Sequence, residues 1–531
     1  MKRIILSTLT AVFVMLSGMN ITAVAQQSES RADAIEYSSS ELPLESARTV
    51  HLETNEGTWL SIDIHPSGEK IIFDYMGDLY ELPIEGGEAR QLTDGMAFDS
   101  QPQYSPDGTK VVYISDRSGG DNVWILNLET MEADQRTHGN NYRMQSPIWT
   151  PNGKYIIAAR AGVRNGLHKF HMYHVNGGSG IEFMDTEERI KTIGAAFGSN
   201  DRYVWFSRRR GDWNYNATFP QYQLAKFDRK TGEIHTQTAR LGSAFRPTLS
   251  SDGKWLVYGT RYRTETGLRI RNLKTGEERW LAYPVQRDDM ESRATLGVLP
   301  RMDFTPNNKA VVASFGGRIW RIPIAEGAEA EEIPFTVDTQ LELGPRLDFQ
   351  YPIKDTDQFI ARQIRDAVPS PDGSKLAFTV LDKLYVMELP DGEPQRITDF
   401  DFTEAFPTWS PNGEWIAFST WSPEKGGHIY KVQPDSDDLQ RLTEQSAIYQ
   451  QLAWSKTQDR IVAIRGEDRM YYQSPGAYMP FTDNELVWIS SEGGPIHFIA
   501  GTDGFEHPHF IKSSDRIYLS DYGEGLISMR Y

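Results

Sequence analysis

A short turn phrase recurs ten times along the chain and constrains the fold more than any other feature. Each copy has a small polar residue, usually proline, then Asp or Asn and usually glycine, followed by an apolar, β-branched or aromatic run. The second positions of the copies are 66, 106, 151, 199, 251, 306, 371, 411, 456 and 513. Most intervals between these positions are 40 to 57 residues, which is typical of the blades of a β-propeller.

The phrase favours a tight turn between two strands. In Ser105-Pro106-Asp107-Gly108, proline presets φ, aspartate hydrogen-bonds its own backbone, and glycine accepts a positive φ. The run that follows, here 110–114, is short and almost continuously apolar, which suits a strand buried between neighbouring blades. A third strand, a glycine turn and a more polar fourth strand complete each repeat. Four antiparallel strands per repeat predict one propeller blade.

Ten blades are too many for one ring, because propellers typically have 4 to 8. The sequence therefore predicts an all-β fold with two tandem β-propellers of four-stranded blades. The widest interval, between Pro306 and Pro371, marks the crossing. We expect a flexible linker at 26–45, a first β-propeller of about six blades at 46–335, and a second at 336–531 with at least four.

The last of the predicted blades is expected to be incomplete. After two predicted strands near the C-terminus, no glycine turn and no fourth strand follow. Two hypotheses address the missing strand. The extended segment Phe335–Leu343 supplies it and clasps the ring, or the natural protein continues beyond Tyr531.

The first 25 residues predict a signal peptide. Lys2 and Arg3 precede an apolar stretch over 4–16 and a small-x-small cleavage site at 23–25. A membrane anchor is the alternative, but polar residues within 17–20 interrupt the stretch before it reaches the roughly 20 residues of a span. No later segment is apolar enough to span a membrane, so we expect a periplasmic or secreted protein with no membrane span after signal removal.

Charge and composition narrow the partners. The formal net charge is −18 and the chain has no cysteine, so no disulfide can form. Nucleic acid is an unsuitable partner, because binding phosphates requires a basic surface. The one strong basic cluster, 208–210, is interpreted by default as a solvated loop beside a strand end.

Several longer stretches carry a more specific resemblance. The repeats resemble the WD40-like (PD40, TolB-type) repeats of the TolB and tricorn protease propellers. The chain after the signal is similar to the N-terminal propeller region of exported amidohydrolase-family proteins, in which the propellers precede a metal-dependent barrel. The stretches that carry this resemblance are 219–224, 259–262, 269–273, 283–288 and 362–366. The chain stops before any barrel, so neither the family's hydrolase activity nor its metal ions are carried onto residues of this chain.

A search for catalytic motifs finds none. No Gly-x-Ser-x-Gly elbow occurs. His168, His171 and His174 alternate faces along one predicted strand, and His507 and His509 are interpreted as part of the first strand of the tenth blade. The acidic run at 435–438 lacks the glycine and distal glutamate of an EF-hand loop. We therefore assign no catalytic residue, no metal ligand and no cofactor.

The connection between the second and third strands of a blade, here called the second turn, is repeatedly long. The long examples are 116–122, 208–221, 261–267, 421–427 and 465–484. Insertions on one face of a repeat protein mark its working surface, although packing of the loops on one another is the alternative. The candidate binding residues on this face are Arg208, Arg209, Trp213, Tyr215, Tyr222, Arg261, Arg263, Tyr471, Tyr472 and Tyr478.

Two hypotheses of function follow. The first is an exported, non-catalytic binding or scaffold protein that uses the second-turn face for a peptide, glycan or protein partner in the cell envelope. The second is the propeller portion of a periplasmic metal-dependent amidohydrolase, which hydrolyses C–N bonds with a separate or fused barrel.

Overall fold

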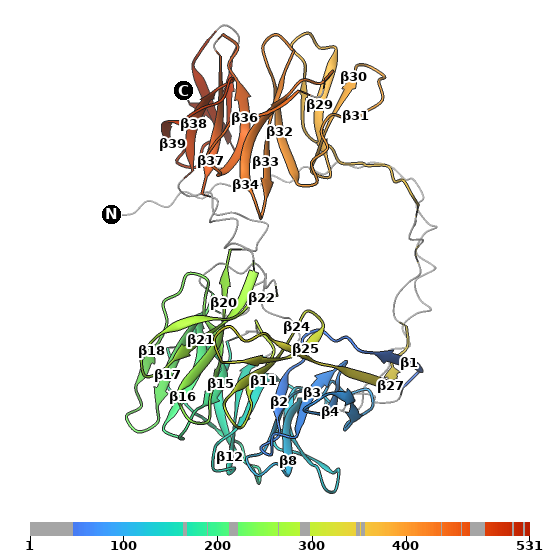
Figure 1. Cartoon of the computed structure of the whole chain (residues 1–531), viewed down its shortest axis with the longest axis vertical. Helices are drawn as coiled ribbons and strands as arrows, with labels where there is room; N and C mark the ends of the chain where they lie inside the picture. The colour runs from blue at the N-terminus through green and yellow to red at the C-terminus, as the bar shows by residue number, and fades with distance from the viewer. Residues whose placement is uncertain are drawn as a thin grey trace, which may run out of the picture. The chain divides into compact units, whose positions relative to one another are not determined.

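The computed structural model describes residues 46–531 except 163–166, 188, 212–220, 264, 287–297, 347–350, 352–355, 437, 458, 468–483, 512–513, 524–525 and 531. The predicted signal peptide and linker lie outside the described residues. Within the described ranges the chain forms strands and no helix (Figure 1), so no helix there could span a membrane. The predicted all-β fold is confirmed.

Six four-stranded antiparallel sheets make up the first set, blades 1 to 6. Blade 1 has β2 (Ile62–Ile64), β3 (Lys70–Tyr75), β4 (Asp78–Pro83) and β6 (Arg90–Gln91), and blade 2 has β7 (Ser100–Tyr104), β8 (Lys110–Ser115), β9 (Asn122–Asn127) and β10 (Ala133–Gln135). Blade 3 has β11 (Tyr142–Trp149), β12 (Tyr155–Gly162), β13 (Lys169–His174) and β14 (Ile181–Glu182), and blade 4 has β15 (Ile190–Phe197), β16 (Tyr203–Arg210), β17 (Gln223–Asp228) and β18 (Ile234–Thr236). Blade 5 has β19 (Phe245–Leu249), β20 (Trp255–Tyr262), β21 (Glu265–Asn272) and β22 (Glu278–Gln286), and blade 6 has β23 (Asp303–Phe304), β24 (Ala310–Phe315), β25 (Arg318–Pro323) and β26 (Glu331–Ile333).

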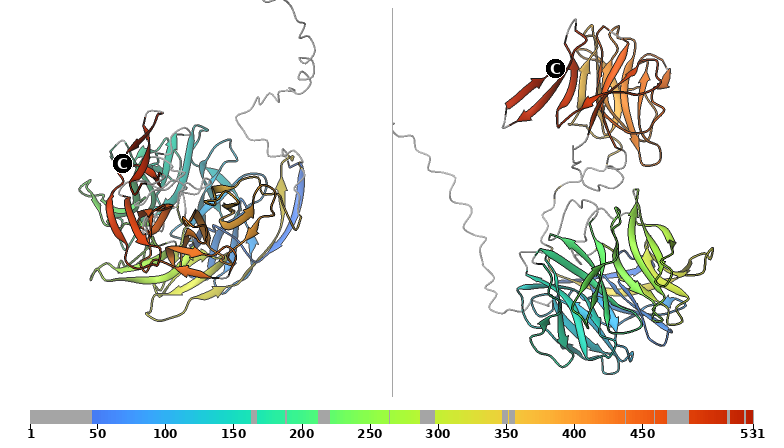
Figure 2. Two further views of the ribbon diagram at one scale, coloured as in Figure 1. Left: turned by 90° about the horizontal axis from the view of Figure 1, so that it is seen from above. Right: turned by 90° about the vertical axis from the view of Figure 1, so that its left-hand side faces the viewer.

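The second set has three four-stranded sheets and one three-stranded sheet among the described residues. Blade 7 has β28 (Arg365–Pro369), β29 (Lys375–Val380), β30 (Lys383–Glu388) and β31 (Gln395–Arg396), and blade 8 has β32 (Thr403–Trp409), β33 (Ile416–Ser422), β34 (Gly426–Val432) and β35 (Leu439–Arg441). Blade 9 has β36 (Ile448–Trp454), β37 (Arg460–Gly466), β38 (Glu485–Ser490) and β39 (His497–Gly501), and blade 10 has β40 (Glu506–Phe510), β41 (Ile517–Gly523) and β42 (Leu526–Arg530). Figure 2 shows the red strands of blade 10 following the orange sheets.

The turn phrase forms the first turn of the blade, as predicted. In blade 2 the Gly108 N–H donates to the Ser105 carbonyl at 2.8 Å, and Asp107 Oδ1 accepts the Thr109 N–H at 3.0 Å. The Ser105 hydroxyl donates to the same carboxylate at 2.6 Å. The hydroxyl-to-Asx contact recurs in blades 3, 5, 6, 7 and 8.

A repeated hydrogen bond joins the inner strands of neighbouring blades. The acceptor is the side chain of the residue that lies three positions before the second residue of the turn phrase. The donor is a backbone N–H of the next blade. Tyr104 donates to Asp63 at 2.9 Å, Trp149 donates to Gln103 at 2.8 Å, and Ile64 donates to Asp303 at 3.3 Å. The last bond runs from blade 1 to blade 6, and a shared apolar core that includes Ile62 and Val312 joins the same two blades. Blades 1 to 6 therefore close into a ring.

The segment that precedes the second set belongs to the first. β27 (Phe335–Leu343) pairs antiparallel with β1 (Arg48–Thr54) and parallel with β5 (Gly87–Glu88). The hypothesis that Phe335–Leu343 supplies the missing strand of blade 10 is therefore wrong. Its alternating pattern, with Val337 buried and Asp338 exposed, is satisfied against blade 1 instead. The boundaries 46–335 and 336–531 stay a prediction, and we propose placing the crossing after Leu343.

A β-bulge interrupts the inner strand of eight blades. The register against the second strand shifts in blades 2 to 5 and 7 to 10. One residue at each shift has a positive φ: Gln101, Ser146, Gly194, Arg246, Asp366, Phe406, Gln451 and His507. Because a bulge re-aims side chains, it breaks the simple alternation of faces along these strands.

The inner strand that begins the second set is less covered than its counterpart in the first. β28 is exposed at most of its positions, whereas β2 is buried throughout between its neighbours. Within the second set, side chains again join successive blades. Thr408 accepts the Trp454 N–H at 3.3 Å, and Gln451 accepts the His507 N–H at 2.6 Å.

Candidate binding groove

Several predicted binding residues lie in the sheets of blades 4 and 5 and not in loops. Arg208 and Arg209 belong to β16, so the interpretation of 208–210 as a solvated loop is wrong. Tyr222 is fully buried in the main core of the first ring, with the Arg209 guanidinium 5.6 Å from its ring centroid. Arg261 lies in β20 and is only 5% exposed. The prediction placed these four residues in exposed loops, and none of them lies in one.

Arg263 does occupy an exposed turn, with a φ of 55° and its guanidinium 5.8 Å from the ring centroid of Tyr262. The remaining candidates, Trp213, Tyr215, Tyr471, Tyr472 and Tyr478, lie outside the described residues. The structure therefore does not bring the ten candidates together into one described surface, and their role in binding stays a prediction.

Two of the second turns predicted to be long are short. Tyr262 pairs with Glu265, so in blade 5 strand pairing extends well into the loop that we predicted over 261–267. Trp421 pairs with Gly427, so most of the predicted loop 421–427 is strand. These segments are rich in the polar and aromatic residues that are common in loops. They nevertheless form strands, because their backbone groups make the hydrogen bonds between strands.

The histidines considered as metal ligands lie in strands or beside them. His509 stacks on Tyr518 with ring centroids 5.8 Å apart, and His507 donates its N–H to Gln451, which confirms that both lie on the first strand of blade 10. His168 is buried just before β13. Within the part of the chain that the structure describes, no three His, Asp or Glu side chains are grouped to hold a metal ion.

A groove lies between blades 7 and 8 on their second-turn side. It has a volume of about 640 Å³, within the range of ligand pockets. Its walls come from the second turns of both blades and from the link that joins them. The lining residues are Leu381, Asp382, Lys383, Asp401, Phe402, Thr403, Trp421, Ser422, Pro423, Glu424 and Lys425.

Leu381 occupies an unusual position at the edge of this groove. Val380 pairs with Lys383, so Leu381 and Asp382 form a two-residue hairpin turn with φ values of 48° and 59°. Such turns favour Asn and Gly, because other side chains resist positive φ. Leu381 is nevertheless 70% exposed. A bulky apolar side chain held in a strained turn and left in water suggests a role outside folding.

Phe402 lies opposite this turn, on the link between the blades. Its ring stacks on Phe400 with centroids 4.5 Å apart, and the Lys425 ammonium lies 5.3 Å from its centroid. Its carbonyl accepts a hydrogen bond from Lys383 Nζ at 2.9 Å. These contacts hold the link against both turns, so the groove has a preformed aromatic wall.

Glu404 anchors the floor beside the groove. It is 1% exposed and accepts the Leu384 N–H at 2.6 Å, while its own N–H donates to the Asp382 carbonyl at 3.0 Å. Burial raises the pKa of Glu404, although hydrogen bonds and nearby cations oppose the rise. The pair of bonds fixes the turn that carries Leu381.

A smaller apolar cavity lies next to the groove, between blades 8 and 9. This cavity has a volume of about 130 Å³ and shares Thr403 and Trp421 with the groove. Phe406, Ile448 and Tyr449 also line it. The combined surface is apolar at its inner end and charged at its rim, which suits a chain segment with one apolar anchor.

The predicted second turn 421–427 supplies one wall of this groove, but sequence reasoning missed the short turn of blade 7 because it searched for long loops. The available signal there was Leu381-Asp382, which stands where a short turn calls for Asn-Gly or Gly-Gly. Blade 6 has Gly316-Gly317 at the equivalent turn.

Comparisons with known proteins agree with the repeat assignment. Residues 43–216 match the family described as PD40, the TolB beta propeller domain. Tricorn protease homolog 1 of Streptomyces coelicolor is 25% identical over 299 residues, which are 54% of this chain and 25% of that protein. The Tol-Pal system protein TolB of Helicobacter hepaticus is 25% identical over 146 residues, which are 26% of this chain and 34% of that protein.

This chain therefore spans only about a quarter to a third of the length of these two relatives. The crystal structure of the tricorn protease aligns with 89% of this chain and 43% of its own, at 14% identity and a TM-score of 0.41. Because this score is low, the fold assignment depends on the strand order and the family match. Residues 43–216, about a third of the chain, are therefore similar to the PD40 repeats of the TolB beta propeller domain.

Proposed function

We propose that this chain is a binding protein of the cell envelope that holds a segment of a protein partner in the groove between blades 7 and 8. The observation that carries the proposal is the groove itself, which combines a suitable volume with the exposed Leu381 and the aromatic wall of Phe402. An envelope location is supported by the sequence of residues 1–25. The PD40 match supports a propeller scaffold for the partner.

The charges at the rim indicate the chemistry of the partner. Asp382, Asp401 and Glu424 form no ion pair with any described residue. Lys383 is engaged by the Phe402 carbonyl, and Lys425 faces the Phe402 ring. With three carboxylates and two ammonium groups, the rim carries a net charge of −1, so the expected segment inserts an apolar side chain and carries Lys or Arg beside it.

The test uses the mature chain and a set of peptides. A peptide with a central Leu or Phe flanked by arginines is titrated against wild type and Phe402→Ala, and binding is measured by calorimetry. Loss of a central aromatic contact costs about 2 kcal/mol, so we expect affinity to fall at least tenfold. Phe498→Ala is the control for loss of an accessible phenylalanine, because Phe498 is exposed (60%) and lies on β39 and not in the groove.

Equal affinity for wild type and Phe402→Ala would contradict the proposal. Equal losses in Phe402→Ala and Phe498→Ala would show that the peptides bind apolar surface without selecting the groove. A peptide of the same apolar residues flanked by glutamates should bind more weakly, and tighter binding of that peptide would contradict the assigned rim chemistry.

The amidohydrolase alternative and a glycan partner stay predictions. An open reading frame that continues past the codon of Tyr531 into a barrel with a His-x-His strand would favour the amidohydrolase. Binding of an envelope glycan, lost in Phe402→Ala, would favour a carbohydrate partner for the same groove.

A further inference from the structure

A second cavity lies where the inner strands of the first ring meet. It has a volume of about 130 Å³ and is lined by inner-strand residues of blades 2 to 5 and by 301–303, which lead into blade 6. Two arginines, Arg246 and Arg301, line it together with Ser146, Gln103 and Asp303. A space of this size holds about four water molecules, since each occupies about 30 Å³ in the liquid.

Arg246 stands at the bulge of β19, with a φ of 55°. Its backbone N–H donates to Ser207 Oγ at 2.9 Å, which fixes the bulge to blade 4. Its side chain crosses the cavity: Nε donates to the Leu299 carbonyl at 3.0 Å and Nη1 to Ser146 Oγ at 3.3 Å. No described residue accepts a hydrogen bond from Nη2, and no described carboxylate lies within ion-pair distance.

Arg301 is different because a carboxyl group lies within ion-pair distance of it. Its Nε lies 3.2 Å from Asp63 Oδ1, and its Nη1 donates to the Pro147 carbonyl at 3.3 Å. Asp74, the carboxylate whose charge acts on Arg246, instead accepts the N–H groups of Ser61 and Gln101 at 2.6 and 2.8 Å. Among the described residues Arg246 therefore has no ion-pair partner, although the charge of Asp74 acts on it.

The environment keeps Arg246 charged. Burial and the repulsion of Arg301 lower the pKa of Arg246 to about 10, which still leaves the guanidinium protonated at neutral pH. Enclosing a charge without an ion-pair partner is costly. Arg246 is half-buried, and it occupies a position where an apolar side chain would carry no such penalty.

Gly194 leaves the guanidinium accessible from blade 4. It occupies the bulge position equivalent to Arg246, with a φ of 62°. A Cβ at this position would lie 3.6 Å from Arg246 Nη1. The missing side chain therefore leaves open the wall of the cavity beside the Arg246 guanidinium.

We propose that this cavity binds a carboxylate, with Arg246 as the charged donor and Ser146 holding the guanidinium in place. Arginine presents paired N–H groups that match a carboxylate. A monoanion is favoured over phosphate, because Asp303 lines the cavity and Asp63 lies beside Arg301, and their repulsion grows with the negative charge of the ligand. The carboxylate belongs either to a small metabolite or to the C-terminus of a chain segment.

The first test measures binding to the intact mature protein by saturation-transfer NMR and calorimetry at constant ionic strength. The probes are acetate, acetamide, inorganic phosphate, tetraglycine and tetraglycine amide. We expect acetate to bind and acetamide not to bind. Tighter binding of tetraglycine than of both acetate and the amide assigns the site to a C-terminus, whereas binding of acetate alone assigns it to a small molecule. No binding by either carboxylate, or tighter binding of phosphate, would overturn the proposal.

The second test changes the donor. Arg246→Gln keeps a polar side chain without the charge, and we expect acetate affinity to fall at least tenfold. Arg210→Gln is the control because Arg210 is an exposed arginine at the end of β16. Ser146→Ala provides a second variant that keeps the charge, and should weaken acetate binding about two- to fivefold by releasing Nη1. Unchanged affinity in both cavity variants would refute the assignment, and the groove of the second set plays no part in either result.

Discussion

Asp303 accepts the backbone N–H of Ile64 at 3.3 Å, although 239 positions separate the two residues in the chain. This bond repeats the link that Asp63 makes to Tyr104 and Gln103 makes to Trp149. The first ring therefore closes with the same interaction that joins consecutive blades. The ring closure also places Asp303 beside Arg301 and Asp63 at the central cavity.

The Asp63–Asp303 pair predicts a pH dependence of stability. Burial raises the pKa values of both carboxyl groups, and Asp303 raises that of Asp63 further, although Arg301 opposes the rise. Folding then favours the protonated forms. This contribution is fully present below about pH 4, where unfolded aspartates are protonated, and is lost as the pH rises through the raised pKa values.

In Asp303→Asn, one of these groups is removed and the repulsion on the other disappears. We expect the loss of stability between pH 5 and pH 8 to be smaller than in wild type by about 1 kcal/mol. Urea unfolding at both pH values measures it. The lost acceptor costs the same at each pH, so parallel behaviour of the two proteins would contradict the prediction.

For Asp107, in the first turn of blade 2, we predict a pH dependence of stability with the opposite sign. Hydrogen bonds from Ser105 and from the Thr109 N–H and hydroxyl lower its pKa to about 2, so its contribution is present above about pH 4 and is lost as the pH falls through 2. Asp107→Ala should cost about 1 kcal/mol at pH 7. Asp107→Asn should cost less, because Asn152 makes the same turn contacts in blade 3. Thermal unfolding of the two variants checks this, and equal losses would show that the side-chain acceptor is not what stabilises the turn.

Replacing Leu381 with glycine should stabilise the fold and weaken peptide binding. Its positive φ of 48° strains a non-glycine residue by about 1–2 kcal/mol, and glycine removes that strain at some entropic cost. Leu381→Gly should therefore raise the free energy of unfolding by about 0.5–1 kcal/mol and weaken binding of the peptide defined above. Urea unfolding and calorimetry on the same samples measure both. A destabilised variant with full affinity would show that Leu381 serves packing instead.

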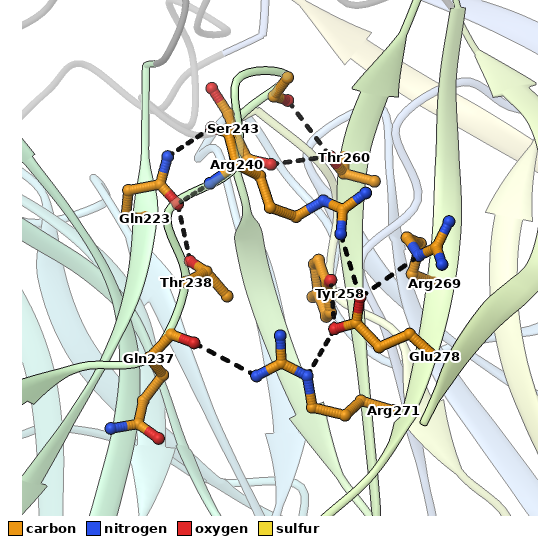
Figure 3. A network of polar contacts seen from close by, with 11 residues as sticks. Gln223, Gln237, Thr238, Arg240, Ser243, Tyr258, Thr260, Arg269, Arg271 and Glu278 are labelled. Atoms are coloured by element: carbon orange, nitrogen blue, oxygen red, sulfur yellow. Dashed lines mark hydrogen bonds and ion pairs between the residues drawn. The ribbon is translucent and has the colours of Figure 1, made fainter. Parts of the chain in front are cut away.

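Glu278 joins blades 4 and 5 through a polar network (Figure 3). It accepts hydrogen bonds from the Tyr258 hydroxyl at 2.7 Å, from Arg271 Nε at 2.5 Å and from Arg240 Nη1 at 3.0 Å. Burial opposes its ionisation, but these hydrogen bonds and charges hold its pKa below the usual range.

Glu278→Gln should therefore leave the guanidinium groups of Arg240, Arg269 and Arg271 without their carboxylate and cost about 2 kcal/mol. Glu277→Gln is the matched control, because Glu277 is exposed and should change stability by less than about 0.5 kcal/mol. Chemical unfolding followed by tryptophan fluorescence compares the two variants. Similar losses in both would mean that the network contributes nothing beyond surface charge.

Local features were predictable from the sequence. The turn at Ser105–Gly108 depends on proline, aspartate and glycine chemistry that acts within a few residues, and the blades follow from its spacing. The strand 335–343 was also recognisable from its alternation, but its partner was not. β27 pairs with β1, almost 290 positions away, and nothing in a single strand specifies which distant edge it will join.

The sequence by itself determined that this protein is a chain of four-stranded blades, because turn chemistry and apolar periodicity are local. Only the tertiary structure decided which side chains meet. The bulges at Gly194 and Arg246 break the alternation of faces, so Arg246 enters the cavity at a position that period-two counting cannot assign. Tyr222 and Arg261 likewise look like loop residues until neighbouring blades bury them. Which side chains are buried and which charged groups come into contact depends on how distant blades pack. The residue order within one blade does not specify that packing.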